Sequence, residues 1–264
     1  MKTTKKTKLT LLIALFALIS VLTPNVKAQA AVTEPAAPTG LDLQVSDLNK
    51  KSSTKNTFRL IWDYDATLEY NTYDTNIKYG YEIVIQTLKG KNIQTIDTTG
   101  YSEYGWIDTN NTGSSYPDAG DKEAIDVKNK KLASQGFKFK VRSYVFDEAG
   151  QRVYSQWSKE KVIIPRATIT KKAMSGSNVK ITWSKVSGAK SYTVYISTNG
   201  KKYKKAASSN GTSAVVKKLK RYQTYYIYVQ ANGVTYKKKK YNSTKAKDLS
   251  RGVDSFYIYT TYVR

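Results

Sequence analysis

Apolar and polar residues alternate most clearly in the stretch LKRYQTYYIYVQA, residues 219–231. A repeat of two residues, in a run rich in Tyr, Ile and Val, predicts a β-strand with one buried face. One parity holds Tyr225, Ile227, Val229 and Ala231, and the other holds Tyr226, Tyr228 and Gln230. If the first set faces the core, Tyr226 and Tyr228 face the surface.

Similar short runs, each bounded by turn residues, divide the rest of the chain into two series. The first series comprises Leu41–Val45, Phe58–Trp62, Tyr81–Ile85, Ile93–Ile96, Tyr104–Ile107, Phe137–Ser143 and Arg152–Ile164. The second comprises Ala167–Lys171, Val179–Trp183, Tyr192–Ile196, Val215–Leu219, Tyr225–Ala231 and Val234–Ala246. Short strands separated by turns predict an all-β fold built from antiparallel sandwiches.

Turns and the end of the chain add detail to this prediction. The pairs Asn199-Gly200 and Asn232-Gly233 predict two-residue hairpin turns, because Asn and Gly tolerate positive φ. The C-terminal tail, residues 249–264, contains the strand-like run Phe256–Val263. An unpaired strand exposes its backbone N–H and C=O groups, so we expect this run to add to a sheet.

Residues 1–30 have the features of a secretory signal peptide. Lysines precede an apolar run from Leu9 to Leu22, and Ala28-Gln29-Ala30 provides a small-residue cleavage site. The apolar run is shorter than the roughly 20 residues that a membrane-spanning helix needs. We therefore expect cleavage after Ala30, no membrane span in the mature chain, and a secreted, extracellular protein that is released or associated with the cell surface.

The stretch WSKVSGAKSYTVYI, residues 183–196, followed by residues 219–231, resembles the fibronectin type III repeats of secreted Gram-positive bacterial proteins. The resemblance covers nearly all of residues 166–248. Residues 31–165 match more loosely, through Trp62, YGYEIVI and FKFKVRSY. The resemblance implies two tandem fibronectin type III-like (immunoglobulin-like) β-sandwiches: module 1, residues 31–165, and module 2, residues 166–248.

The resemblance also assigns a structural role to one tyrosine. In these sandwiches a buried tyrosine of the sixth strand hydrogen-bonds to the chain upstream, forming a tyrosine corner, and Tyr225 stands at that position. Module 1 has Phe137 at the corresponding position, so the hydroxyl bond is lost there. Module 1 also carries two insertions, residues 64–79 and 108–131, which the resemblance places between strands B and C and between strands E and F.

Charge is distributed unevenly between the two modules. The whole chain has a formal net charge of +24. Residues 31–165 hold 17 Lys and Arg against 18 Asp and Glu, whereas residues 166–264 hold 22 against two. Such an excess repels itself and favours a partner of opposite charge. One possible source of this opposite charge is module 1 itself, because we expect part of its second insertion to lie near the basic edge of module 2. The acidic residues of that insertion are Asp108, Asp118, Asp121, Glu123 and Asp126.

The chain contains neither Cys nor His. This excludes Ser–His and Cys–His catalysis and zinc sites built from these residues.

Some carboxylates could serve glycoside hydrolysis, although a solvated loop explains them equally well. They are Asp63, Asp65, Glu69 and Asp74. The run DTNNTG, residues 108–113, resembles a calcium loop, but Ala119 stands where the bidentate carboxylate is needed. We predict that the protein is not an enzyme and has no cofactor or metal.

The sequence YSQWS, residues 154–158, is similar to the WSxWS element of cytokine receptors. If the strand Phe137–Ser143 points its phenylalanines inward, Lys138, Lys140 and Arg142 point outward on the same sheet. We expect these cations to stack on Trp157 and Tyr154, each pair contributing about 0.5–1 kcal/mol when exposed. Binding of a glycan by Trp157 is the alternative.

Tyrosines and lysines are predicted to share one face of module 2. With Tyr192, Val194 and Ile196 inward, Tyr195 faces outward, and the resemblance places its strand beside that of Tyr226 and Tyr228. Further lysines on neighbouring strands are Lys201, Lys202, Lys204, Lys205, Lys237, Lys238, Lys239 and Lys240. Rings beside cations suit sugar faces, stacked bases and phosphates. An ordinary sheet surface rich in Lys and Tyr is the alternative.

These features favour a binding protein of the cell envelope. We predict that module 2 binds an anionic cell-wall polymer, wall teichoic acid or a polysaccharide, by releasing counterions. Module 1 serves as a recognition or spacer domain, and a host or bacterial surface protein is a further candidate partner. The alternatives are a glycan-binding or adhesive module that uses the exposed tyrosines, and an extracellular nucleic-acid binder.

Overall fold

The computed structural model describes residues 32–44, 57–63, 65, 67–68, 79–99, 122–245 and 254–258. The predicted signal peptide, the calcium-like loop and most of the first insertion lie outside these ranges. All the strands below belong to one compact unit, Glu34–Arg264.

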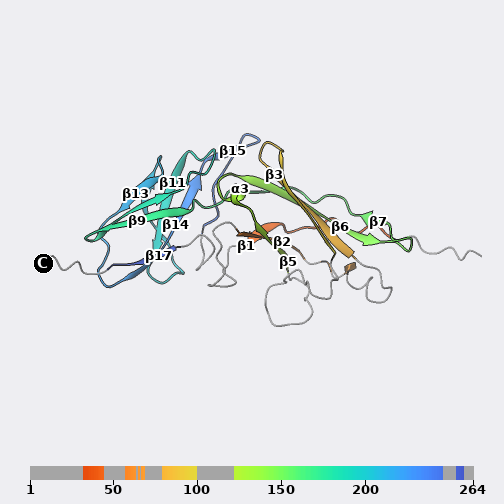
Figure 1. The fold of residues 1–264 in the computed structure, drawn as a ribbon, viewed down its shortest axis with the longest axis horizontal. Helices are drawn as coiled ribbons and strands as arrows, with labels where there is room; N and C mark the ends of the chain where they lie inside the picture. Colours follow the sequence, from red (N-terminus) through yellow and green to blue (C-terminus); the bar gives the residue numbers. More distant parts are fainter. Residues whose placement is uncertain are drawn as a thin grey trace, which may run out of the picture. The chain divides into compact units, whose positions relative to one another are not determined.

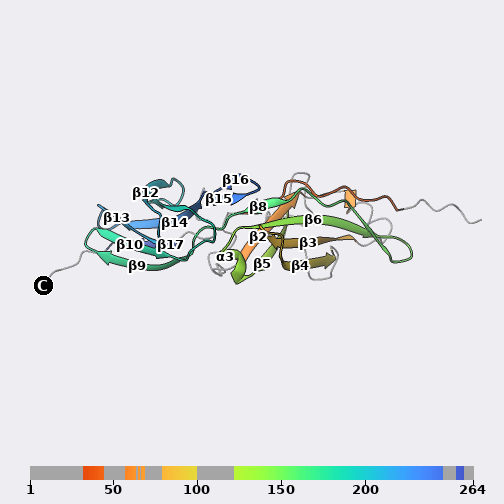
Figure 2. The same cartoon turned by 90° about the horizontal axis from the view of Figure 1, so that it is seen from above.

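Module 1 contains two antiparallel sheets (Figures 1 and 2). The first has the order β1-β2-β5, with bounds Asp42–Gln44, Thr57–Asp63 and Lys122–Lys128. The second has the order β4-β3-β6-β7, with bounds Asn92–Thr99, Tyr79–Thr87, Phe137–Phe146 and Arg152–Tyr154. A further strand, β8 (Lys161–Ile163), pairs with the opposite end of β6, and a short helix, α3 (Lys130–Ala133), precedes β6.

Module 2 repeats this arrangement. One sheet has the order β13-β10-β9, with bounds Ser213–Val216, Asn178–Trp183 and Ile169–Ser175. The other has the order β12-β11-β14-β17, with bounds Lys204–Ser209, Ser191–Ser197, Thr224–Asn232 and Asp254–Tyr257. A separate hairpin joins β15 (Val234–Tyr236) to β16 (Lys239–Tyr241).

In both modules the first, second and fifth strands form one sheet, and the fourth, third, sixth and last strands form the other. This is the strand order of the fibronectin type III sandwich, and it confirms the predicted fold class. The alternating residues supply the cores, because one parity of each central strand is buried. In module 1, Trp62 and Tyr81 meet edge to face at 5.1 Å. In module 2, Val194, Ile227 and Val229 are fully buried.

The C-terminal tail supplies the last strand of module 2. Strand β17 pairs antiparallel with the first half of β14, and the following residue, Ile258, is 1% exposed. The prediction that this run adds to a sheet is confirmed for Phe256 and Tyr257, and residues 259–263 of the predicted run lie outside the described residues. The predicted boundary at residue 248 separates the tail from module 2, whereas the structure includes residues 254–258 in the sandwich.

Both predicted two-residue hairpins are wrong. Strand β11 ends at Ser197 and β12 begins at Lys204, and the Asn199 side chain accepts the Lys201 and Lys202 N–H groups at 3.0 Å, so it stabilises a longer loop. Strand β15 pairs with β16 rather than with β14. The tight turn lies between them at Lys237 and Lys238, whose φ angles are 46° and 62°.

The fifth strand of module 1 lies elsewhere than the sequence predicts. The predicted run Tyr104–Ile107 falls outside the described residues, and β5 occupies part of the segment assigned to an insertion. The apolar pattern did not predict β5 because this strand contains Glu123. Glu123 is acidic but only 3% exposed, and its carboxylate lies 3.4 Å from the Tyr81 hydroxyl. Burial and this carboxylate raise the pKa of Tyr81 well above its usual value. A buried charge breaks the apolar alternation by which strands are detected.

Candidate ligand-binding surface

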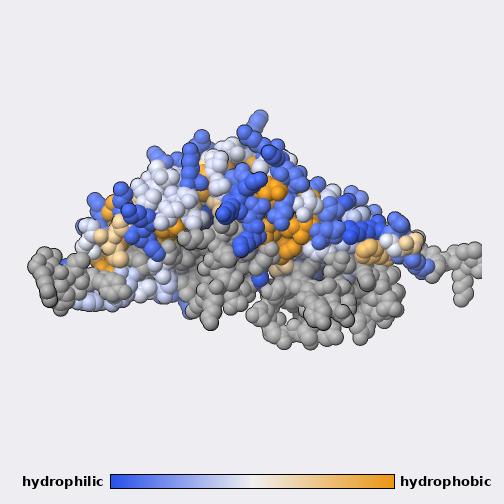
Figure 3. Space-filling model, viewed as in Figure 1, coloured by the Kyte–Doolittle hydropathy of each residue, from blue (hydrophilic) through white to orange (hydrophobic). Residues whose placement is uncertain are grey.

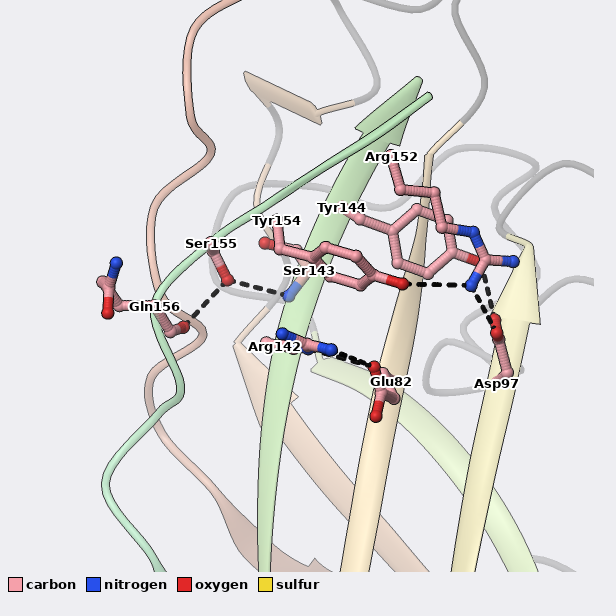
Figure 4. A network of polar contacts seen from close by, with 9 residues as sticks. All are labelled: Glu82, Asp97, Arg142, Ser143, Tyr144, Arg152, Tyr154, Ser155 and Gln156. Atoms are coloured by element: carbon pink, nitrogen blue, oxygen red, sulfur yellow. Dashed lines mark hydrogen bonds and ion pairs between the residues drawn. The ribbon is translucent and has the colours of Figure 1, made fainter. Parts of the chain in front are cut away.

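Serines of the YSQWS segment complete the edge of β6 where regular pairing stops. The Ser143 N–H donates to the Ser155 hydroxyl at 2.9 Å, and the Ser155 N–H donates to the Ser143 carbonyl at 2.9 Å (Figure 4). Ser158 exchanges the same two bonds with Val141, also at 2.9 Å. Both hydroxyls replace backbone acceptors, so β6 remains hydrogen-bonded between β7 and β8.

This segment also positions Trp157 and Tyr154 against outward cations of β6. The Lys140 ammonium lies 4.0 Å from the centre of the Trp157 ring. The Arg142 guanidinium lies 4.6 Å from the Trp157 ring and 3.7 Å from the Tyr154 ring. Arg142 also donates to Glu82 at 2.6 and 3.0 Å (Figure 4). For Lys140 and Arg142, these contacts are the stacking expected from the sequence.

Sequence reasoning missed a second cluster on the same sheet. The Arg152 guanidinium lies 4.2 Å from the Tyr144 ring and donates to Asp97, and the Tyr144 hydroxyl donates to Asp97 at 2.7 Å. Figure 4 shows Arg152 and Asp97 beside the Tyr144 hydroxyl. Burial acts to raise the pKa of Asp97, but the hydrogen bonds from Arg152 and Tyr144 outweigh it and the pKa is lowered. The signal that could have revealed the cluster is the pair of aromatic residues in YVF, residues 144–146, followed by Arg and Tyr at alternate positions in RVY, residues 152–154.

Lys138 does not join the Trp157 stack, which corrects the prediction for that residue. Its ammonium donates to Glu160 at 2.7 Å and lies 5.6 Å from the Tyr236 ring. Glu160 also accepts from Tyr236 at 2.7 Å and from Lys237 at 2.7 Å. Lys138 and Glu160 belong to module 1, whereas Tyr236 and Lys237 belong to the β15–β16 hairpin of module 2. We call these four residues the junction cluster.

The junction cluster is a different contact from the internal ion pairing that the sequence suggested, which stays a prediction for the acids outside the described residues. Glu123 is buried within module 1, Asp126 lies on β5, and the other three acids of the insertion lie outside the described residues. Lys237 pairs with Glu160, a carboxylate outside that insertion. A backbone bond from Ser187 to Ser134, at 2.8 Å, also joins the two modules.

Replacing Glu160 by Gln is expected to flatten the pH dependence of stability in acid. Hydrogen bonds from Lys138, Lys237 and Tyr236 lower the pKa of Glu160 from 4.5 to about 2. Because the folded-state pKa is the lower one, the stabilisation is complete above pH 4.5 and is lost as the pH falls toward 2. Glu160 is partly exposed, so the effect is at most about 1 kcal/mol.

Urea unfolding midpoints of wild type and Glu160→Gln, measured at about pH 6 and about pH 3, check this. The difference in urea midpoint between wild type and Glu160→Gln should be smaller at the lower pH. Lys238→Asn is the matched control: it removes a charge from the next turn position, whose lysine makes no ion pair with a described residue, and should leave the pH profile unchanged. An equal gap at both pH values would contradict the assignment.

The tyrosine face of module 2 is less open than the alternation predicts. Tyr195 and Tyr228 stack with ring centres 5.0 Å apart and planes 9° apart. The Tyr203 ring meets Tyr228 edge-on at 5.1 Å, and the Arg166 guanidinium lies 5.0 Å from the Tyr228 ring. Tyr228 is consequently only 1% exposed, whereas Tyr195 and Tyr226 are half-buried. The prediction that Tyr228 is an exposed ligand residue is therefore wrong.

The predicted lysines stand at two separate places in module 2. Lys201 and Lys202 are exposed in the loop after β11, and Lys204 and Lys205 are exposed on β12. Lys238, Lys239 and Lys240 are exposed on the β15–β16 hairpin. None of these seven makes an ion pair with a described residue, whereas Lys237 is bound to Glu160. Figure 3 shows hydrophilic side chains spread over the described part of one face.

Tyr225 adopts the position that the resemblance implies. Its ring is buried, and its hydroxyl accepts the Lys220 N–H at 2.8 Å, five residues upstream. Phe137 is fully buried at the equivalent place in module 1 and meets Phe58 edge-on at 5.6 Å.

A scan against protein-family models and a search of curated proteins find no match. Among solved structures, a fibronectin type III domain of the human KIAA0970 protein is 22% identical, with a TM-score of 0.28, covering 38% of this chain and 76% of its own. The chicken CNTN1 FN1–FN3 domains are 15% identical, with a TM-score of 0.28, covering 86% of this chain and 68% of theirs. Within the described ranges, no helix has the length and apolar character to cross a membrane.

Proposed function

We propose that this is a secreted, non-enzymatic protein of the cell envelope, and that module 2 binds an anionic polymer such as wall teichoic acid or an acidic polysaccharide. A fibronectin type III fold is consistent with an adhesive or binding module. The signal-peptide features of residues 1–30 support secretion. Module 1 acts as a spacer or as a recognition domain for a host or bacterial surface protein.

One observation carries the proposal: the cations of module 2 far outnumber its carboxylates. Residues 166–264 hold 22 Lys and Arg but only two acidic residues, and the carboxylate that binds Lys237 belongs to module 1. At about 0.15 M salt, charges farther apart than about 8 Å are largely screened from one another. The carboxylates of module 1 therefore neutralise few of these lysines, and a flexible polyanion can displace counterions from the rest.

The buried state of Tyr228 weakens both alternatives. A sugar-binding or base-stacking platform requires open ring faces. One face of Tyr228 is covered by Tyr195, and Arg166 and Tyr203 also contact its ring. The cations of module 2 are mostly lysines, which contact phosphates as point charges rather than through the planar fork of Arg.

A salt gradient tests the proposal. The mature protein is expected to bind purified cell walls or immobilised poly(glycerol phosphate) at about 0.1 M salt and to elute well below about 1 M, because counterion release makes affinity steeply salt-dependent. A neutral polysaccharide matrix serves as the control and should not retain it. Retention that is unchanged across this range, or equal on the neutral matrix, would contradict electrostatic binding.

A further inference from the structure

The loop between β13 and β14, residues 217–222, has the sequence KKLKRY. Its exposed side chains are Lys217, Lys218, Lys220, Arg221 and Tyr222, and Tyr222 is 67% exposed. Leu219 is 6% exposed and packs into the core of module 2. Four cations and an aromatic ring thus surround a single buried anchor.

Hydrogen bonds from three other segments hold the backbone of this loop. The Lys218 N–H donates to the Asn178 side chain at 3.2 Å, and the Leu219 N–H donates to the Ser177 carbonyl at 2.9 Å. The Lys220 N–H donates to the Tyr225 hydroxyl at 2.8 Å, and the Tyr222 N–H donates to the Ile258 carbonyl at 3.0 Å. The tyrosine corner and the last strand therefore fix the loop before any ligand binds.

Two residues of the loop adopt a conformation that their side chains disfavour. The φ angles of Lys218 and Tyr222 are 57° and 55°, a region that Gly and Asn occupy more easily. Strained positions of this kind occur preferentially at binding sites, where the surrounding structure maintains them. Here the strain turns a cation and the most exposed large aromatic side chain of the described residues outward.

The four cations of the loop make no ion pair with any described residue. The pairing of Ser197 with Tyr226 brings the end of β11 beside the start of β14, so the loop carrying Lys201 and Lys202 lies at the same end of the sandwich. Like charges gathered on a rigid loop create a positive potential that attracts a multivalent anion. Because the backbone is already ordered, binding loses less conformational entropy than it would on a flexible loop.

We propose that residues 217–222 form the principal contact of module 2 with its anionic polymer, a phosphodiester-linked chain of the teichoic-acid type. This inference rests on the proposed function and names its site. Lysine ammoniums bind successive phosphates, and Tyr222 packs on the uncharged linker between them. A nucleic acid is the less favoured partner, since the loop offers one open ring and no row of stacking platforms.

Two charge-matched variants of the full mature chain test the site. The loop variant combines Lys217→Gln, Lys218→Asn, Lys220→Gln and Arg221→Gln. The control combines Lys238→Asn, Lys239→Gln, Lys240→Gln and Lys245→Gln, which removes the same number of charges elsewhere in module 2. Asn is used at the positions with positive φ because it tolerates that conformation. Thermal unfolding of both variants establishes that they remain folded.

Affinity for poly(glycerol phosphate) is then measured at several salt concentrations. The loop variant should bind at least about tenfold more weakly than wild type. The slope of its log affinity against log salt concentration should become shallower by roughly one for each phosphate that it no longer binds. The control should bind less than about threefold more weakly. Equal weakening in the two variants would overturn the site while leaving polyanion binding intact. Failure of the wild type to bind would overturn the proposed function itself, and tighter binding to single-stranded DNA at equal phosphate concentration would overturn the choice of partner.

Discussion

Replacing Gly80 by alanine should destabilise module 1 by about 3 kcal/mol, at the upper end of what overpacking of a core costs. Gly80 lies on β3, and a Cβ atom there would stand 2.0 Å from the Thr98 carbonyl oxygen and 2.4 Å from the Tyr144 hydroxyl oxygen. Both distances are far below van der Waals contact. The substitution can be accommodated only if the β3–β4 ladder or the Tyr144 ring moves.

Neither neighbour can move at low cost. Thr98 lies on β4, which is hydrogen-bonded to β3 along its length. The Tyr144 hydroxyl donates to Asp97 at 2.7 Å, and its ring packs against Tyr154 at 5.4 Å and lies 4.2 Å from the Arg152 guanidinium. The cluster shown in Figure 4 therefore holds the ring in place.

Gly211→Ala is the matched control, because its Cβ would have a single neighbour within 4 Å, the Ser209 hydroxyl at 3.6 Å. It should change the free energy of unfolding by no more than about 0.5 kcal/mol. Urea unfolding followed by far-UV circular dichroism measures both variants. A Gly80→Ala protein with the stability of wild type would show that Tyr144 does not occupy this position.

Replacing Tyr228 by alanine should destabilise module 2 by about 3–5 kcal/mol, the usual cost of removing a buried aromatic ring. The ring is 1% exposed, stacks on Tyr195 and contacts Tyr203. Its removal would also leave Arg166 without the ring that it now faces at 5.0 Å. The cost combines a cavity with the loss of these ring contacts.

Tyr226→Ala provides the comparison, since Tyr226 lies on the same strand and the same parity but is half-buried. It should cost about 1 kcal/mol or less. Thermal and urea unfolding of the two variants give both values. If Tyr228 were an open ligand residue, the two substitutions would have equally small effects on stability, and Tyr228→Ala would reduce binding by the folded protein.

The strand pattern predicts the fold class correctly and misplaces one ring by the same rule. Alternation in residues 219–231 correctly places Ile227 and Val229 in the core, because the pleat of a strand sends successive side chains to opposite faces. The same rule places Tyr228 on the outer face of its sheet, which is correct, but it also implies that the ring is exposed to solvent, which is wrong. Arg166 and Tyr203, far away along the chain, contact that face of the sheet.

Local signals also fail where a strand lacks apolar alternation or where a turn uses unusual residues. Strand β5 contains the buried Glu123, so apolar and polar residues do not alternate regularly along it. The β15–β16 turn has two lysines at positive φ, where Asn-Gly is the expected pair. The Asn232-Gly233 pair lies four residues away and predicts a turn at the wrong place.

The sequence by itself determined what depends on composition and on near neighbours: β-strands, the parity of each strand, and a cationic half next to a neutral one. Only the tertiary structure decided which charges are neutralised and which rings are covered. Glu160 reaches Lys237 across 77 positions, and the 217–222 loop is held by Ser177, Asn178 and Ile258. The physical reason is that a strand pattern encodes only the direction of a side chain, whereas its exposure and its ionic partners depend on segments that packing brings from elsewhere in the chain.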